Sequence, residues 1–421
     1  MAADSCHSRS LSWLVKSCIP ADPARHIAVP VPVPVPVPAP AICTTQPPPP
    51  PSSAPIYALP DDLLLECLAR VPRSSLPPLP AVCRRFAALL SSNAFLHLRR
   101  AHAQFQPSLL AVSVSDHGTV AQTLLQFNTS TPTADVAALP LPQTLLHCSS
   151  AAFAHARAVV LGREVFLIGR GATLCVDALT GATRACAPTL FPRKKFAAAA
   201  VGDRIYVAGG SARTAAVEEY VPEADAWRVV AEAPRRRYGC AGAGAGGVFY
   251  VAGGVAVSGE GARTLEAHVC AGSVDALHVA SGSWARPRAL PGGGCVVGAC
   301  GVGEHLYVVA SHAVELSFWR WCGGAGRGGD GRGWGGWVVL EAPPMPRGSV
   351  WLGMAVRVAM AGLGTERVAA VVSAAAVRGH NSGAGALEGL VLVYEIASGK
   401  WSRAPDLPPG FRRAAYAGVE C

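Results

Sequence analysis

RIYVAGG, at residues 204–210, returns 44 residues further on as VFYVAGG, at residues 248–254. A looser copy, VFLIG at residues 165–169, comes before the first, and LYVVA at residues 306–310 follows the second with its glycines replaced. Each copy is a short run of β-branched and aromatic residues after a glycine-containing turn, which predicts a β-strand. From residue 108 onward the chain is therefore expected to repeat a unit of short strands.

A tryptophan signature follows these strands. An aromatic or aliphatic residue stands seven positions before a tryptophan, with turn residues between the two and a proline after them. Clear copies are Tyr220 to Trp227 with Pro234, Leu277 to Trp284 with Pro291, and Tyr394 to Trp401 with Pro405 and Pro408. Degenerate copies are Val176 to Thr183 with Pro188, Phe127 to Ala134 with Pro140, and Trp337 with Pro343, which follows the Gly/Arg-rich insert 322–336. These copies make six units of about 40 to 60 residues.

Units of this length, each with several short strands, predict a mainly β fold, a six-bladed β-propeller. A β-sandwich with chance Gly-Gly pairs is the alternative. The order Gly-Gly, Tyr, Trp resembles the kelch repeat over about 310 residues. In such a propeller we expect the glycines to allow close backbone packing and the tryptophan to pack between neighbouring blades. The predicted kelch-repeat domain is 108–421, with blades at about 108–147, 155–190, 193–234, 235–291, 294–346 and 350–409.

Residues 412–421 read as the first strand of a seventh unit, whereas the first unit, from Ser108, lacks that strand. Pairing of the two segments would close the ring and remove an open sheet edge, so we expect 412–421 to complete the first blade.

The segment before the repeat has helical spacing instead. Leu63, Leu64, Leu65 and Leu68 follow an acidic turn and stop at Val71-Pro72, and two further short apolar sets lie between Val82 and Leu98. Three short helices within residues 56–100 make a small core, and a unit of this size usually buries its remaining apolar face on a partner.

The stretch LPDDLLLECLARVPRSSLPPLPAVCRRFAALLSSNAF, residues 59–95, resembles an F-box. The resemblance implies docking to the Skp-family adaptor of a cullin-based, SCF-type ubiquitin ligase. Two features depart from the family: Phe86 stands where tryptophan is usual, and Pro77, Pro78 and Pro80 must shorten or distort a helix. The residues expected to contact the adaptor are Leu59, Pro60, Leu63, Leu64, Leu68, Val71, Pro72, Val82, Cys83 and Phe86.

Residues 1–55 are expected to be a disordered Val/Pro-rich tail. Val29 to Pro40 nearly alternates valine with proline, and Pro47 to Pro51 is a proline run. Because each proline fixes φ and removes an amide donor, an extended polyproline-like spacer is favoured over a ligand for an SH3- or WW-type groove.

Composition excludes several classes of protein. Only 15% of the 421 residues are charged, and 45 glycines and 35 prolines are unlike a long helical or coiled-coil chain. The 51% of apolar residues can build a core, so the chain is not wholly disordered. The longest apolar run, Val368 to Val377, is far shorter than the roughly 18 residues of a membrane span, so no membrane partner is expected.

The net charge of +9 does not predict nucleic-acid binding. The arginines are scattered, and the densest cluster, Arg235 to Arg237, has no aromatic ladder beside it. The 14 cysteines form no C-x-x-C pair and show no zinc spacing, which is typical of buried thiols in a reducing compartment. The N-terminus lacks the apolar region of a secretory signal, so the cytoplasm or nucleus is favoured. A plastid transit peptide is the alternative, because the first 26 residues carry Ser and Arg and little acid.

No catalytic residue, cofactor or metal site is predicted. GAGAGG, residues 242–247, fits a dinucleotide-binding pattern but precedes a strand instead of opening a helix. The segment 116–118 lacks the Ser and Trp of a sialidase Asp-box, and no Cys–Tyr pair of a copper oxidase is identifiable. A propeller enzyme would also need clustered acids or metal ligands, and none are seen.

The sequence therefore predicts a non-catalytic receptor, in which an F-box docks the adaptor and a propeller binds the protein to be ubiquitinated and degraded. A kelch scaffold without ligase function is the alternative. Substrate contacts are expected in the long loops 255–268, 311–336 and 373–387. Basic residues that open several units have two open interpretations, as contacts for an acidic partner surface or as residues that solvate turns: Arg193, Arg235, Arg236, Arg347 and Arg412. Fused F-box and kelch modules are especially numerous in plants, and the resemblance suggests enzymes of phenylpropanoid and flavonoid synthesis, such as chalcone synthase, as targets.

Overall fold

The structure is a computed structural model of the whole chain. It describes residues 55–115, 119–127, 135–148, 150–257, 270–312, 315–322, 336–345, 354–376, 387–408, 410–411 and 414–421. The chain has two compact units, Met1–Ala58 and Leu59–Cys421. Residues 1–54 of the predicted tail lie outside the described residues. The described part of the first unit is the short 3-10 helix η1 (Pro55–Ala58).

The second unit begins with three short helices, α1 (Asp61–Ala69), α2 (Arg84–Ser91) and α3 (Asn93–Ala101). The side chains of Cys83 and Ser92 cap α2 and α3 by accepting from the amides of Phe86 and Phe95. The proline-rich stretch between α1 and α2 holds the 3-10 helices η2 (Arg73–Ser75) and η3 (Leu79–Ala81), so the prolines do shorten this helical segment as expected.

Six sheets follow, each made of antiparallel neighbours. The first contains β1 (Pro107–Val114), β2 (Thr119–Gln126), β3 (Asp135–Pro140) and, from the far end of the chain, β27 (Ala415–Glu420). The second contains β4 (Arg157–Leu161), β5 (Glu164–Ile168), β6 (Thr173–Asp177) and β7 (Thr183–Cys186). The third contains β8 (Ala197–Val201), β9 (Arg204–Ala208), β10 (Ala216–Val221) and β11 (Ala226–Glu232).

The fourth sheet contains β13 (Ala241–Ala245), β14 (Val248–Ala252), β16 (Ser273–His278), β17 (Ser283–Trp284) and β18 (Arg288–Ala289), and β12 (Arg237–Tyr238) pairs with β15 (Val255–Ala256) apart from it. The fifth contains β19 (Cys295–Val302), β20 (His305–Ser311), β21 (Leu316–Cys322) and β22 (Gly336–Leu340). The sixth contains β23 (Met354–Leu363), β24 (Arg367–Ala376), β25 (Leu387–Glu395) and β26 (Lys400–Arg403). Short helices η4 (Gln143–Leu145), α4 (Ser150–Phe153) and η5 (Pro222–Ala224) lie between strands.

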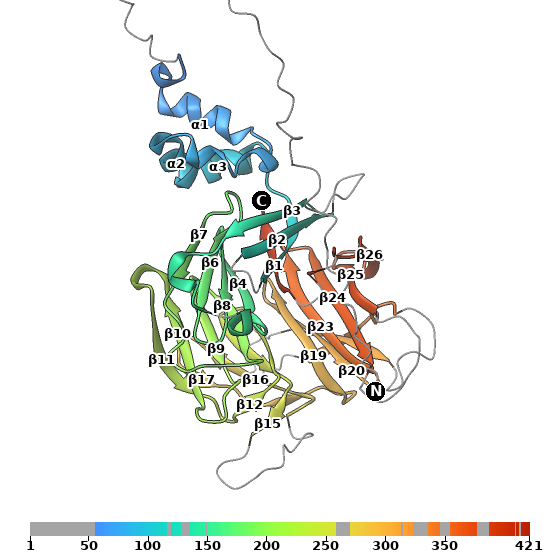
Figure 1. Cartoon of the computed structure of the whole chain (residues 1–421). Coiled ribbons are helices and arrows are strands. Elements are labelled where there is room, and N and C mark those ends of the chain that lie inside the picture. Colours follow the sequence, from blue (N-terminus) through green and yellow to red (C-terminus); the bar gives the residue numbers. More distant parts are fainter. Residues whose placement is uncertain are drawn as a thin grey trace, which may run out of the picture. The chain divides into compact units, whose positions relative to one another are not determined.

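The six sheets form a closed β-propeller, which confirms the predicted fold class (Figure 1). The first strand of each sheet lines a central channel, in the order β27, β4, β8, β13, β19 and β23. Ring closure is made by β27, which pairs with β1 from Pro107 opposite Glu420 to Val112 opposite Ala415. The first sheet thus receives the strand that its own part of the sequence lacks.

The seven-residue spacing of the tryptophan signature is the register of the outer hairpin in blades three, four and six. Tyr220 pairs with Trp227, Leu277 with Trp284, and Tyr394 with Trp401. Each indole N–H then donates to a carbonyl of the preceding blade, at 2.8 Å for Trp227 to Ala187, 2.8 Å for Trp284 to Glu232 and 2.7 Å for Trp401 to Glu341. The tryptophans therefore join neighbouring blades as predicted.

The glycine doublets are required by backbone conformation and by space. Gly209 has a φ of +74°, and a Cβ there would lie 2.7 Å from the Arg237 carbonyl oxygen of the next blade. Gly253 repeats this arrangement with a φ of +68° and a Cβ position 2.7 Å from Val296. Only glycine meets both conditions, which is why the doublet recurs in the sequence.

Candidate protein-interaction sites

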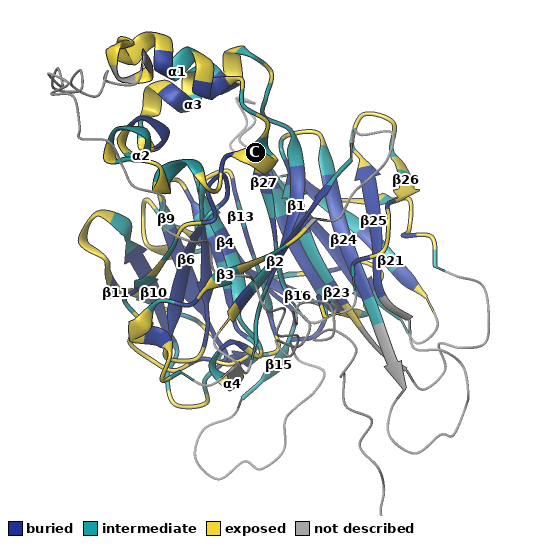
Figure 2. Cartoon of the chain, turned by 45° about the horizontal axis from the view of Figure 1, so that its top comes forward, coloured by how far each residue is buried: buried dark blue, intermediate teal, exposed yellow. Residues whose placement is uncertain are grey.

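An apolar surface is exposed on the helical module. Leu63 on α1 is 50% exposed, Leu59 just before α1 is 37% exposed, and Val82 before α2 is 60% exposed. Pro60 and Pro72 are exposed as well, and Figure 2 colours much of α1 as exposed. Exposed apolar residues this close together mark a docking surface more often than single scattered ones do.

The positions of Leu59 and α2 are tied together by one arginine. Arg85 on α2 donates from Nε to Asp61 Oδ1 at 2.7 Å and from Nη2 to the Leu59 carbonyl at 2.5 Å. The first turn of α2 is thereby held against the beginning of α1. Because Val82 lies just before α2, this arginine fixes Leu59 and Val82 on neighbouring elements.

Two residues predicted to contact an adaptor are instead part of the core. Leu64 and Leu68 are 3% and 5% exposed, and they pack with Leu89, Leu90 and Phe95. They support the surface and do not form it, because a side chain on the buried side of α1 cannot reach a partner. Val71, Cys83 and Phe86 are half-buried, and Cys83 serves as the N-cap of α2.

Cys67 was not among the predicted contact residues, although it is exposed. It lies four positions after Leu63, so both occupy one face of α1. The helical spacing from Leu63 was the signal that would have identified it.

The helical module is also bound to the propeller within the second unit. Arg73 donates to the Ala178 carbonyl at 2.6 Å, and Arg163 of the second blade donates to the Leu90 carbonyl at 2.5 Å. Buried apolar residues of both parts belong to one cluster. Because Leu63 and Val82 stay exposed despite these contacts, the propeller leaves the apolar surface accessible.

Arg193 was predicted as a substrate contact, and the structure contradicts this. Arg193 is 1% exposed and forms an ion pair with Glu218, at 2.6 Å between Nη2 and Oε1, with both side chains fully buried. It also donates to the carbonyls of Gly209 and Ala216 at 2.7 Å. All three guanidinium nitrogens donate hydrogen bonds inside blade three, so the role of Arg193 is structural.

Blade four repeats this arrangement with a different arginine. Arg237, which is fully buried, pairs with Asp275 at 2.7 Å and donates to the Gly253 carbonyl at 2.8 Å. Arg235 adds a second, partly exposed pair to Asp275 at 2.7 Å. Arg236 donates to the Ala212 carbonyl, while Arg347 and Arg412 lie outside the described residues. Arg235 and Arg236 thus stay candidates for contact with a partner.

The loops predicted to contact substrate lie largely outside the described part of the chain. This holds for residues 258–269, 313–314, 323–335 and 377–386, which fall within or beside the three predicted segments. The strands that flank these loops are described and belong to the propeller: β15 and β16, β20 to β22, and β24 and β25.

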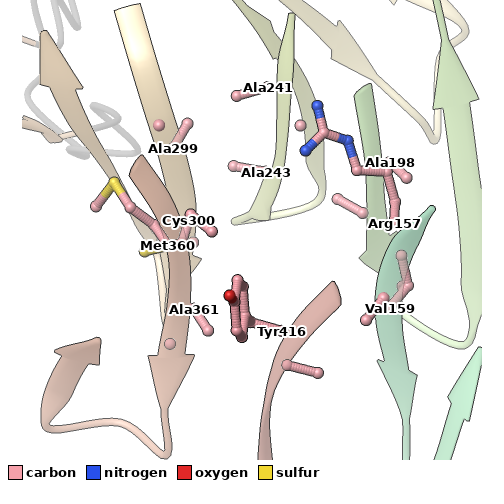
Figure 3. A pocket seen from close by; sticks show the side chains of 18 of the residues that line it. Arg157, Val159, Ala198, Ala241, Ala243, Ala299, Cys300, Met360, Ala361 and Tyr416 are labelled. Carbon is pink, nitrogen blue, oxygen red and sulfur yellow. The ribbon is translucent and has the colours of Figure 1, made fainter. Parts of the chain in front are cut away.

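The central channel contains a cavity of about 360 Å³ lined by the six inner strands. Alanine and glycine dominate its wall, and Figure 3 shows the larger side chains of Arg157, Met360, Cys300 and Tyr416. Among the described residues no group of three His, Cys, Asp or Glu side chains is arranged to hold a metal ion, and no helix is long and apolar enough to cross a membrane.

A three-helix docking module joined to a six-bladed propeller is the architecture of a two-part interaction protein, and sequence comparisons name the class. An F-box domain matches residues 56–98 and a Kelch motif matches residues 192–234. The F-box/kelch-repeat protein At5g26960 of Arabidopsis thaliana is 42% identical over 99% of this chain and 100% of its own length. The chain therefore belongs to the F-box/kelch-repeat proteins.

More distant similarities cover parts of the chain. The F-box/kelch-repeat protein At1g67480 of Arabidopsis thaliana is 26% identical over 47% of this chain and 54% of its own length. The solved structure of YjhT aligns with 61% of this chain and 84% of its own, at 14% identity and a TM-score of 0.44.

Proposed function

We propose that this protein is the substrate-recognition subunit of an SCF-type ubiquitin ligase. F-box/kelch-repeat proteins are in general substrate adaptors of such ligases, and no catalytic role is proposed for this chain. The observation that supports docking is the accessible apolar surface of Leu59, Leu63 and Val82 on the helical module. Apolar anchors of this kind contribute most of the free energy of a protein interface.

The mechanism is proximity. The helical module binds a Skp-family adaptor, and the propeller binds a target protein. Lysines of the target are then held near the charged conjugating enzyme at a high effective concentration. The chain contributes binding and orientation, and the ubiquitin transfer is carried out by other subunits. Enzymes of phenylpropanoid and flavonoid synthesis such as chalcone synthase are the proposed targets, and the cytoplasm or nucleus is the proposed compartment.

Adaptor binding is tested by a pull-down of the full chain with a purified Skp-family adaptor. The double variant Leu63→Asp/Val82→Asp places two charges on the apolar surface, and binding should fall by about a hundredfold or more. The matched control is Val339→Asp, because Val339 is 64% exposed on β22 of the propeller. Its binding should equal that of the unchanged protein.

The unchanged protein, the double variant and the control must have the same thermal midpoint, so that a loss of binding can be attributed to the changed surface and not to unfolding. If the unchanged protein does not bind the adaptor, the ligase proposal is wrong and the kelch scaffold without ligase function takes its place. Target capture is then measured by co-precipitation of chalcone synthase from proteasome-inhibited cells, and absence of the enzyme from the precipitate rejects that target.

A further inference from the structure

Arg157 is a cation in the channel wall without an acidic partner. It is the first residue of β4, and Figure 3 shows its side chain extending toward Ala198 of β8 and Ala241 of β13. It donates from Nε to the Phe196 carbonyl at 2.8 Å and from Nη2 to the Cys240 carbonyl at 3.0 Å. No carboxylate of the described residues lies within 4.0 Å of it.

The other arginines in comparable positions differ in this respect. Arg193 and Arg237 open blades three and four, and each is paired with a buried carboxylate, Glu218 or Asp275. Desolvation of a guanidinium is costly unless an opposite charge compensates it, and two carbonyl dipoles compensate only in part. Burial does lower the pKa of Arg157, as expected for a cation that lacks a counter-charge.

Further basic groups act on His155, which stands two residues before Arg157. Burial, followed by the charges of Lys194, Lys195, Arg357 and Arg157, lowers the pKa of His155 below its ordinary value of 6.5. These four cations come from β4, β23 and the segment before β8, so three blades contribute to one positive region. None of the four forms an ion pair with a carboxylate of the described residues.

We propose that the channel is a binding site for a small polyanion, a compact molecule with two or more carboxylate or phosphate groups. Arg157 is the anchoring residue, and Lys195 and Arg357, whose charges act on His155 two residues before Arg157, bind the second anionic group. A planar guanidinium matches a carboxylate or phosphate through paired N–H donors, and Nη1 of Arg157 is not used by either carbonyl.

The size and wall of the cavity favour a compact ligand over a peptide. A volume of about 360 Å³ is at the lower end of the range for small-molecule sites, roughly 300 to 1,000 Å³. Strands surround it, and most of the wall is alanine and glycine, whose short side chains leave space for a ligand. Met360 and Tyr416 supply an apolar contact for the body of the ligand (Figure 3). This site is separate from adaptor docking and does not depend on it.

The test is isothermal titration calorimetry of the full chain with sodium pyrophosphate and with sodium citrate, at constant ionic strength set by chloride. Saturable binding of at least one probe is expected, and the pair of titrations distinguishes a phosphate site from a carboxylate site. Arg157→Gln should weaken binding at least about tenfold, and Lys195→Gln and Arg357→Gln about threefold each. The matched control is Arg286→Gln, because Arg286 is an exposed arginine outside the channel, and its affinity should be unchanged.

Arg157 also joins carbonyls of two other blades, so its replacement can destabilise the ring. The variants at Lys195 and Arg357 then decide, since neither side chain donates a hydrogen bond to the described protein. Unchanged affinity in both variants would overturn the proposal, as would absence of saturable binding to either probe. Binding of hexaglutamate by a protein that binds neither small anion would also overturn it, in favour of an acidic-peptide site.

Discussion

Replacement of Glu218 by glutamine should destabilise the propeller strongly. Both Glu218 oxygens are used, one by Arg193 at 2.6 Å and the other by the Leu190 amide at 2.5 Å, and the ion pair is fully buried. In Glu218→Gln the amide NH₂ must face one of these donors, and the guanidinium of Arg193 keeps its charge without a counter-charge. Removal of one partner of a buried ion pair costs about 3 to 5 kcal/mol.

The assay is thermal unfolding, monitored by near-UV circular dichroism. At about 2 to 4 °C per kcal/mol for large domains, the midpoint should fall by roughly 6 to 20 °C. Removal of both charges in Arg193→Met/Glu218→Leu should cost less than Glu218→Gln alone, because no uncompensated ion is left. The control is Asp406→Asn, which removes an exposed pair with Arg403, 63% and 51% exposed, and should cost under about 1 kcal/mol. A Glu218→Gln protein as stable as this control would refute the structural role of the pair.

Three further perturbations test other parts of the fold. Trp227→Phe removes the 2.8 Å hydrogen bond to Ala187 and should lower the free energy of unfolding, measured in urea, by about 1 to 2 kcal/mol. Trp337→Phe should lower it clearly less, because the Trp337 indole N–H has no partner among the described residues. Deletion of residues 414–421 removes β27 and should abolish the cooperative thermal transition; a sharp transition at the original midpoint would contradict closure by this strand. The pKa of His155 is lowered in the folded protein, so its contribution to stability is present above the unfolded value of 6.5 and is lost as pH falls. His155→Gln should therefore lessen the drop in midpoint between about pH 7 and pH 5, and an equal drop in both proteins would contradict this.

The repeat could be interpreted from sequence because its signals are local. The distance from Tyr220 to Trp227 is fixed by one hairpin, and a glycine doublet reports one backbone conformation. The ring closure could also be predicted, because the sequence shows both the unit at Ser108 that lacks a strand and the additional strand near residue 415.

The role of Arg193 was misjudged because it depends on contacts between strands. Arg193 and Arg237 are buried only because an acid on the third strand of the blade meets them. A signal did exist, since Glu218 and Asp275 each stand nine residues before the blade tryptophan, Trp227 or Trp284. Likewise Leu63, Leu64 and Leu65 are consecutive, and spacing alone does not decide which of them faces the core of a three-turn helix.

Pairing of β27 with β1 has a consequence for biosynthesis. Roughly 300 residues separate these partners, and at about 5 to 20 residues per second β1 waits some 15 to 60 seconds on the ribosome for its neighbour. During that time the first sheet offers an unpaired edge from Pro107 to Val112, the six residues that β27 later pairs with. A chain interrupted after β1 but before β27 keeps this edge permanently, so all such truncated products carry the same exposed strand for chaperones and proteases to bind.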